Sequence, residues 1–349
     1  QSMQKARGKL PSWLATEGII WPEPVSVEQS SSEITARYKA NLASGSTLAD
    51  LTGGMAVDTA AFSKNFSRVD YIEPNKELAE IAASNLSVLQ CCNVTFHHVT
   101  AEDFLEKQHD RFDWIYIDPS RRSGGNKVFR LEDCSPNLLH IMPLCLQRAE
   151  KVLIKLSPMA DLTVLRKQLE PSHFWILAVG NEVKEVLCLT TREKMEPVVY
   201  AVDLDATGQG EAFSFAWHEE NETIAETGMP EKYIYEPSAA ILKAGAFKLY
   251  GLRYGLKKLQ AHSHFYTSDN LKPQIQGRKF RLLELFRNES AMKERISPGD
   301  KVHVIARNYP QTADQLKRKY QLVEGGSHYL IATTLADGAR VMFYCERVG

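Results

Sequence analysis

The stretch LADLTGGMAVDT, Leu48–Thr59, decides the fold of this chain together with VDYIEP, Val69–Pro74. Its pattern predicts a short apolar strand, a tight turn at Gly53 and Gly54, a helix, and a second strand that ends at the Glu73 carboxylate. An α/β sheet holds a nucleoside in this order of elements, because the glycine turn leaves room for a ligand and the acidic residue accepts from a ribose diol. The sequence therefore predicts a nucleoside site at this turn.

Strands and helices continue to alternate up to about Thr190, which predicts a doubly wound, mostly parallel α/β sheet of the Rossmann-like kind. EVKEVLCLTT follows HFWILAVG so closely that these two strands are expected to pair as an antiparallel hairpin, which gives the sheet an antiparallel last strand. A helix is expected over Ser135–Glu150, with Pro136 in its first turn. The strands expected from apolar patterning are Leu48–Leu51, Arg68–Ile72, Val94–His97, Trp114–Ile117, Val152–Lys155 and Phe174–Val179.

A chain of 349 residues is too long for one ordinary domain. Helical patterning covers residues 3–45, and the α/β pattern covers 46–222. A linker with a helix-rich unit covers 223–276, and short strands and helices fill 277–349. We therefore expect an N-terminal helical segment, an α/β domain, a connecting segment and a small C-terminal α+β domain.

The near-neutral net charge of −1 conceals an asymmetry along the chain. Thr223–Gly349 holds 20 Lys and Arg against 12 Asp and Glu, whereas the rest holds 22 against 31. A basic third indicates a nucleic-acid partner, although a solvated lysine-rich face is the commoner cause of such an excess. No apolar run is long enough for a membrane span and no secretory signal pattern begins the chain, so we expect a cytoplasmic protein without a membrane partner.

Two common kinds of ligand site are disfavoured by the sequence. The six cysteines include no C-x-x-C pair and the histidines lack a Cys or carboxylate at ligand spacing, so we expect no metal. The glycine turn lacks the third glycine of G-x-G-x-x-G and the Gly-Lys-Ser/Thr of a P-loop, which disfavours a pyrophosphate cradle. A nicotinamide-dependent oxidoreductase is disfavoured for the same reason, and a nucleoside without phosphates fits better.

S-adenosylmethionine is a nucleoside that matches the polar residues around the turn. Asp50 suits the ammonium of its amino-acid part, and Glu73 suits its ribose. After the third strand, Glu102 or Asp103 is placed to accept from the adenine amino group, while Ala101 donates a backbone N–H. An alternative interpretation is that both carboxylates stabilise a helix N-terminus.

The fourth strand ends in IDPS, Ile117–Ser120, at the edge of the sheet where ligands of doubly wound folds bind. With DLTGG at Asp50–Gly54 and the acidic Glu73, the order and spacing of these motifs resemble the class I S-adenosylmethionine-dependent methyltransferases over about Glu28–Thr190. IDPS stands where the amino-methyltransferases of that family carry D/N-P-P-Y. The resemblance implies S-adenosyl-L-methionine as cofactor, bound by Asp50, Thr52, Gly53, Gly54, Glu73, Pro74, Ala101 and Glu102.

A narrower resemblance rests on EQSSSEITARYKA at Glu28–Ala40, DPSRR at Asp118–Arg122, KLSP at Lys155–Pro158 and the basic tail. Together they are similar to a bacterial group of methyltransferase-like proteins with a ferredoxin-like segment and a C-terminal THUMP-like domain. The resemblance implies that residues 223–276 are the linker and ferredoxin-like segment and that 277–349 are THUMP-like. Because THUMP domains are associated with RNA binding, it also implies an RNA partner, either rRNA or tRNA.

The DPSRR motif departs from D/N-P-P-Y at two positions. Ser120 replaces the second proline, and Arg121 replaces the aromatic residue that stacks on a flipped base. An arginine plane stacks on a base or binds phosphate, so Arg121, Arg122 and Lys155 are the expected substrate-binding residues. The alternative is that the two arginines pair with carboxylates and that Lys155 is an ordinary strand-end residue.

We therefore predict an S-adenosylmethionine-dependent methyltransferase that acts on RNA. Asp118, Pro119 and Ser120 are its expected catalytic residues. An exocyclic amine of a base is a candidate acceptor, because Asp118 would accept its N–H and take up developing positive charge. The rival hypothesis is an RNA-binding adaptor in which the methyltransferase fold persists without turnover, which the departures at Ser120 and Arg121 motivate.

Overall fold

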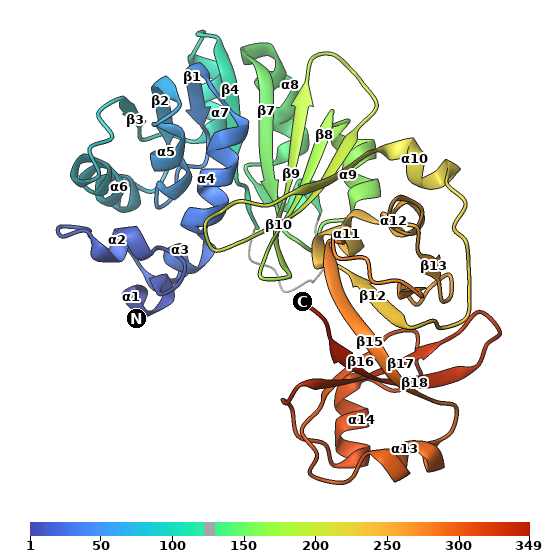
Figure 1. Ribbon diagram of the computed structural model, residues 1–349. Coiled ribbons are helices and arrows are strands. Elements are labelled where there is room, and N and C mark those ends of the chain that lie inside the picture. The colour runs from blue at the N-terminus through green and yellow to red at the C-terminus, as the bar shows by residue number, and fades with distance from the viewer. Residues whose placement is uncertain (122–129) are drawn as a thin grey trace. The chain divides into compact units, whose positions relative to one another are not determined.

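The structure of the protein is a computed structural model that describes residues 1–121 and 130–349 (Figure 1). Its contacts divide the chain into two compact units, Gln1–Ser214 and Phe215–Gly349, which we call unit 1 and unit 2. Arg122, one of the expected substrate-binding residues, lies outside the described residues. Within the described part, no helix combines the length and the apolar character that crossing a membrane takes.

Unit 1 is built on a nine-stranded sheet with the order β11-β10-β8-β9-β7-β4-β1-β2-β3. β1 pairs in parallel with β2 and β4, β2 with β3, and β4 with β7, whereas β9 is antiparallel to both β7 and β8. The expected doubly wound sheet and its antiparallel hairpin are confirmed. The strands are β1 Gly45–Asp50, β2 Phe66–Ile72, β3 Val94–His97, β4 Phe112–Ile117, β7 Ala149–Leu156, β8 His173–Val179, β9 Glu182–Thr191, β10 Val198–Leu204 and β11 Ala212–Ala216.

Most helices that follow the parallel strands begin where the sequence supplies an N-cap. The side chains of Asn75, Thr100, Asn137 and Asp161 accept backbone N–H groups in the first turns of α6, α7, α8 and α9. α5 begins differently, after Ala56 in the left-handed region with a φ of 67°, and has no side-chain cap. These helices are α5 Val57–Phe62, α6 Lys76–Val88, α7 Ala101–Lys107, α8 Leu138–Arg148 and α9 Leu162–Leu169.

The helix expected over Ser135–Glu150 begins later than predicted. Its first turn is capped by the Asn137 side chain, so Pro136 lies before the helix and not inside its first turn. Cys134–Ser135 form the short strand β6, which pairs antiparallel with β5, Ser120–Arg121. The backbone after β4 is therefore held by a two-stranded ladder that the sequence pattern did not indicate.

The N-terminal residues of unit 1 form four short helices against α5 and α6 (Figure 1). Leu10, Trp13 and Val27 are buried in one apolar cluster with Val57 of α5. The Asn85 side chain of α6 fixes the segment by exchanging two hydrogen bonds with the backbone of residue 20, each 2.8 Å long. The helices are α1 Ser2–Ala6, α2 Pro11–Ala15, α3 Pro24–Gln29 and α4 Glu33–Leu42.

Unit 2 is built on a seven-stranded sheet with the order β13-β14-β12-β15-β18-β17-β16. β12, from the connecting segment, pairs antiparallel with β15, from the C-terminal segment, so the two segments share one sheet. Its helices α13 and α14 pack around an apolar cluster that includes Phe286, Met292 and Leu316. The elements are α10 Trp217–Glu222, β12 Tyr233–Pro237, α11 Ala239–Ala244, α12 Phe247–Tyr254, β13 Lys257–Lys258, β14 Tyr266–Ser268, β15 Gly277–Phe286, α13 Glu289–Arg295, β16 His303–Ala306, α14 Ala313–Tyr320, β17 His328–Thr334 and β18 Arg340–Arg347.

Candidate active site

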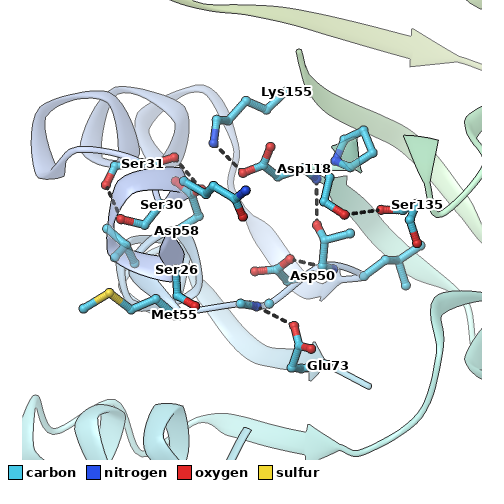
Figure 2. A pocket seen from close by; sticks show the side chains of 18 of the residues that line it. Ser26, Ser30, Ser31, Asp50, Met55, Asp58, Glu73, Asp118, Ser135 and Lys155 are labelled. Carbon is cyan, nitrogen blue, oxygen red and sulfur yellow. Dashed lines mark hydrogen bonds and ion pairs between the residues drawn. The ribbon is translucent and has the colours of Figure 1, made fainter. Parts of the chain in front are cut away.

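A cavity of about 820 Å³ opens in unit 1 at the carboxyl ends of β1, β2, β4 and β7 (Figure 2). Its volume lies in the range of pockets that bind small molecules and cofactors. The loops after these strands and after β3 line it, and so does the segment from α3 to the start of α4. The lining includes Ser26, Glu28, Ser30, Ser31, Asp50–Asp58, Glu73, Pro74, Ala101, Glu102, Asp118–Ser120, Ser135, Pro136, Lys155–Pro158 and Lys184.

The two glycines of the turn are required for different reasons. A Cβ on Gly53 would lie 2.1 Å from the Tyr71 ring, so packing excludes any side chain there. Gly54 has a φ of +52°, which favours glycine, and a Cβ there would meet only the Thr52 carbonyl oxygen, at 3.7 Å. The Tyr71 hydroxyl donates to the Gly54 carbonyl oxygen over 2.7 Å and holds the turn against β2.

Glu73 lies beside this turn at the end of β2, half-buried in the cavity wall. Its Oε2 accepts the N–H of Gly54 over 3.0 Å, and its Oε1 accepts the N–H of Asn75 over 2.8 Å. Each carboxylate oxygen retains a further lone pair after these bonds. The carboxylate is therefore fixed in orientation and still has acceptor capacity for two hydroxyl groups.

Asp50 lines the cavity at the end of β1, and two groups of the same chain donate to its carboxylate. Its side chain accepts from the Thr59 hydroxyl over 2.6 Å and from the Thr52 N–H over 3.2 Å, and the residue is 1% exposed. Burial raises the pKa of the Asp50 carboxyl to about 7. The contacts give Asp50 the task of holding the glycine turn on α5.

Of the two carboxylates after β3, Glu102 lines the cavity. Asp103 instead accepts from the Thr100 hydroxyl over 2.9 Å and pairs with Lys107 over 3.0 Å on the exposed side of α7. Asp103 therefore has the helix-stabilising role that the sequence left open. Ala101, whose N–H is an orphan donor of the helix start, lines the cavity beside Glu102.

The residues after β4 are held at both the backbone and the side chain. The Asp118 N–H donates to the Thr52 hydroxyl over 2.6 Å, and the Asp118 carboxylate pairs with Lys155 (Figure 2). Ser120 donates to the backbone carbonyl oxygen of Ser135 over 3.3 Å. Pro119 lies between them in the cavity wall, and the backbone of residue 121 pairs with Cys134. The Arg121 side chain and Arg122 are not described, so their substrate contacts stay predictions.

The Asp118–Lys155 pair is largely removed from water. The two side chains are 29% and 12% exposed. Burial raises the pKa of the Asp118 carboxyl, and the Lys155 ammonium opposes that rise. Burial also lowers the pKa of Lys155, but the carboxylates of Asp118, Asp58 and Glu185 outweigh burial and raise it, which keeps the ammonium protonated.

The whole chain is similar to a protein of known structure. A crystal structure from Porphyromonas gingivalis W83, described as that of a methyltransferase, matches with a TM-score of 0.88 and 31% identity, covering 99% of this chain and 88% of that one. Two uncharacterized S-adenosylmethionine-dependent methyltransferases, from Mycobacterium tuberculosis strains CDC 1551 and H37Rv, are each 22% identical over 341 residues, covering 94% of this chain and 86% of theirs. The chain belongs to the S-adenosylmethionine-dependent methyltransferases.

Unit 2 of this methyltransferase matches two domain families. Residues 233–275 match a ferredoxin-like domain, and residues 277–347 match a THUMP domain-like family. The resemblance stated from the sequence is thereby confirmed for the C-terminal part as well as for the family. The cofactor is S-adenosylmethionine, and the glycine turn and the Glu73 carboxylate fit its ribose.

The sequence patterns missed a charged cluster behind the cavity of this methyltransferase. Lys39 of α4 is fully buried and contacts Glu185 Oε1 at 2.7 Å, Asp58 Oδ1 at 3.2 Å and Ser31 Oγ at 2.9 Å. Asp58 Oδ2 in turn accepts from the hydroxyls of Ser31, over 2.7 Å, and Tyr116, over 2.9 Å. A lysine on the apolar face of a helix, between Ala36 and Ala40, was the available signal.

The N-terminal segment was also missed as a part of the site. Lys9 donates from Nζ to the carbonyl oxygens of Val27, over 2.9 Å, and Glu28, over 2.7 Å, which fixes the loop that carries Ser30 and Ser31 to the cavity. Burial and the nearby Lys155 ammonium lower the pKa of Lys9 to about 8. Residues that precede the glycine turn in the sequence therefore contribute to the site of this methyltransferase, as do residues that follow it.

Proposed function

We propose that this methyltransferase acts on RNA, with the methyl acceptor presented at the Asp118–Lys155 pair. The observation that carries the proposal is the match of residues 277–347 to a THUMP domain-like family, because THUMP domains are associated with RNA binding. The excess of Lys and Arg over residues 223–349 supports it. A basic domain supplies affinity for phosphates that does not depend on base sequence.

The proposed cofactor contacts follow from the geometry of the turn. Glu73 accepts from the ribose hydroxyls, and Ala101 and Glu102 contact the adenine. Gly53 lets the turn pack against Tyr71, Gly54 supplies its positive φ, and Asp50 holds the turn, which presents the backbone of both glycines to the ligand. Thr52 and Pro74 complete the wall that these residues form. When bound, the cofactor supplies an activated methyl group on a sulfonium, so the residues of this chain need only align the acceptor with it.

Exposed basic residues of unit 2 are candidates for phosphate contacts. α14 carries Lys317 and Lys319, which pair with Glu324 and Glu289 respectively, and Arg318, whose Nε donates to a backbone carbonyl oxygen over 3.3 Å. Exposed ion pairs of this kind contribute little to stability, because water screens their charges. A phosphate can therefore take the place of the carboxylate partner at little cost.

One observation argues against an exocyclic amine as the methyl acceptor. Such an amine arrives on a base that stacks on an aromatic ring in flipped-base sites. Among the described residues that line the cavity, none is Phe, Tyr, Trp or His.

The proposal is tested by incubating the full chain with methyl-labelled S-adenosylmethionine and total cellular RNA. Label in RNA supports RNA methylation, and label in protein or small molecules but not in RNA contradicts it. RNA retention at low salt without any transfer supports the adaptor hypothesis instead.

Glu73→Ala tests the cofactor part of the proposal. We expect S-adenosylhomocysteine to bind about 10 to 100 times more weakly, because hydrogen bonds to a charged group are lost. Isothermal titration calorimetry measures the change. Glu77→Ala, in the exposed first turn of α6, is the matched control and should bind as the wild type does. Equal affinities of all three proteins would contradict the assignment.

A further inference from the structure

We propose that the methyl acceptor is a hydroxyl oxygen bound between Asp118 and Lys155, and that in RNA it is the ribose 2′-hydroxyl. The inference rests on the proposed action on RNA and deepens it by naming the acceptor atom. It comes from a buried charged cluster that cofactor binding at the Glu73 end does not use.

The cluster consists of two lysines and three carboxylates brought together by five elements. Its members are Lys39 of α4, Asp58 of α5, Asp118 after β4, Lys155 of β7 and Glu185 of β9. Lys39 bridges Asp58 and Glu185, and Lys155 pairs with Asp118. Charges of alternating sign therefore run from the interior of the sheet to the cavity wall, where Asp118 and Lys155 lie side by side (Figure 2).

Removing such a cluster from water costs free energy, so its presence calls for an explanation. Lys39 is fully buried, and Glu185 is 3% exposed. Replacing buried ion pairs by apolar residues of similar volume is often neutral or stabilising, so fold stability does not account for them. Asp118 and Lys155 are the members with side chains that reach the cavity as a pair, which points to a function at that wall.

The pair matches the chemistry of a hydroxyl and conflicts with that of an amine. A hydroxyl must lose its proton as its oxygen bonds to carbon, so it needs a base and a positive charge near the developing negative charge. A carboxylate with an adjacent ammonium supplies both. An amine becomes positively charged as it is methylated, and the Lys155 ammonium would oppose that charge.

The side chains that line the cavity suit a sugar better than a base. Several hydroxyl groups line the cavity, those of Ser26, Ser30, Ser31, Ser120 and Ser157. The described lining residues include no aromatic ring on which a base could stack. RNA carries one hydroxyl at each internal nucleotide, on the 2′ carbon of the ribose, and this group both donates and accepts hydrogen bonds. It can therefore donate to Asp118 and accept from Lys155 at the same time.

The proposed step is balanced by these two residues and the donor. The hydroxyl oxygen forms a bond to the methyl carbon while the bond from that carbon to sulfur breaks, and the electron pair of the broken bond stays on sulfur. The hydroxyl proton passes to the Asp118 carboxylate, and Lys155 stays protonated and stabilises the oxygen as it gains negative charge. Asp118 and Lys155 are thus the catalytic residues, and Lys39 and Glu185 are positioning residues.

Product analysis decides between the acceptors. RNA labelled by the full chain is digested to nucleosides, and the sugar and base fragments are separated by mass spectrometry. We expect the methyl group on the ribose, and a DNA oligonucleotide of the same sequence should accept none. Methyl on a base would overturn the hydroxyl inference and leave RNA methylation standing, whereas no label in any RNA would overturn both.

Variants test the role of the pair. Lys155→Met should lower kcat at least about 100-fold, with the affinity for S-adenosylhomocysteine within threefold of the wild type by calorimetry. Lys151→Met removes an exposed lysine from the same strand, where its Nζ lies 4.9 Å from the centre of the Trp114 ring, and should keep wild-type kcat. A Lys155→Met enzyme with more than a third of wild-type kcat would overturn the inference.

The pH profile of kcat of Lys39→Met distinguishes a positioning role of Lys39 from a purely structural one. The charged or titratable groups around Asp118 are Lys155, Asp58, Lys39, Lys9, Asp50 and Tyr116. Loss of the Lys39 positive charge should shift the acidic limb of the profile of kcat to higher pH, in protein shown by circular dichroism to be folded. A lower rate with an unmoved acidic limb would contradict the positioning role, and Glu185→Gln should move the limb in the opposite direction.

Discussion

The Glu73 end and the Lys155 end of the cavity differ in what holds their side chains in place. At the Glu73 end, backbone N–H groups of Gly54 and Asn75 orient the carboxylate, and all three residues lie within one stretch of sequence. At the Lys155 end, side chains hold one another, and they come from elements spread from α4 to β9. The first end is a product of local backbone geometry, and the second depends on the complete fold of unit 1.

The largest expected effect is the loss in the free energy of unfolding when a buried charge is removed at the Lys155 end. Lys39→Met should lower the free energy of unfolding by about 3 to 5 kcal/mol, because it leaves two buried carboxylates without their partner. Urea unfolding measures the change. Lys76→Met is the matched control, since its ion pair with Glu80 is exposed and contributes at most about 1 kcal/mol. A loss below about 1 kcal/mol for Lys39→Met would remove the proposed contrast between the two ends.

The next effect concerns pH and the Asp50 carboxyl. Burial raises its pKa from 3.8 to about 7, so the folded state binds more protons than the unfolded state between these values. The contribution of Asp50 to the free energy of unfolding is fully present below about pH 4. It is lost as the pH rises towards 7. The free energy of unfolding changes by at most about 1.4 kcal/mol per pH unit over this range. Urea unfolding from pH 4 to 8 should show this loss in the wild type relative to Asp50→Asn. A constant difference between the two proteins would contradict the assignment.

The two glycines allow a smaller test within the Glu73 end. Gly53→Ala should cost about 1 to 3 kcal/mol, because its Cβ overlaps the Tyr71 ring. Gly54→Ala should cost only about 1 kcal/mol, because the backbone strain of a positive φ is its main penalty. Thermal unfolding of the two variants ranks the effects, and the reverse order would show that backbone strain governs this turn more than packing does.

The smallest effect distinguishes the two carboxylates of α7. Glu102→Ala should weaken S-adenosylhomocysteine binding by about 1 kcal/mol, the contribution of one hydrogen bond. Asp103→Ala removes the contacts with Thr100 and Lys107 on the exposed side of the helix, so it should leave the affinity unchanged. Calorimetry measures both. If only Asp103→Ala weakens binding, the adenine contact is assigned to the wrong residue.

The sequence predicted the Glu73 end better than the Lys155 end, and the reason is physical. Periodicity and glycines report local backbone conformation, so the strands β1 to β4, β7 and β8, the turn and the antiparallel hairpin were foreseen. The motif order also identified the family and its cofactor. The ion pair of Asp118 was not foreseen, because Asp118 follows β4 whereas Lys155 lies on β7, and only the sheet order makes them neighbours.

One further miss has a similar origin. Pro136 was assigned to a helix because it suits a first turn, yet the Asn137 cap starts α8 after it, and Ser135 pairs with Ser120 instead. The contact of Asp50 with Thr59 was not foreseen either, and the role of Asp50 towards the ammonium group of the cofactor stays a prediction.

The pairing of β12 with β15 in unit 2 bears on how this part of the chain can vary. Gly277 begins β15 with a φ of +142°, and a Cβ there would lie 2.1 Å from the Glu236 carbonyl oxygen, so the join between the ferredoxin-like and THUMP-like segments is itself packed backbone. A break at this join would expose the edge of β15 along a whole strand. The two segments are therefore expected to stay together in variants of this chain, because separating them would leave the edge of a strand uncovered in each.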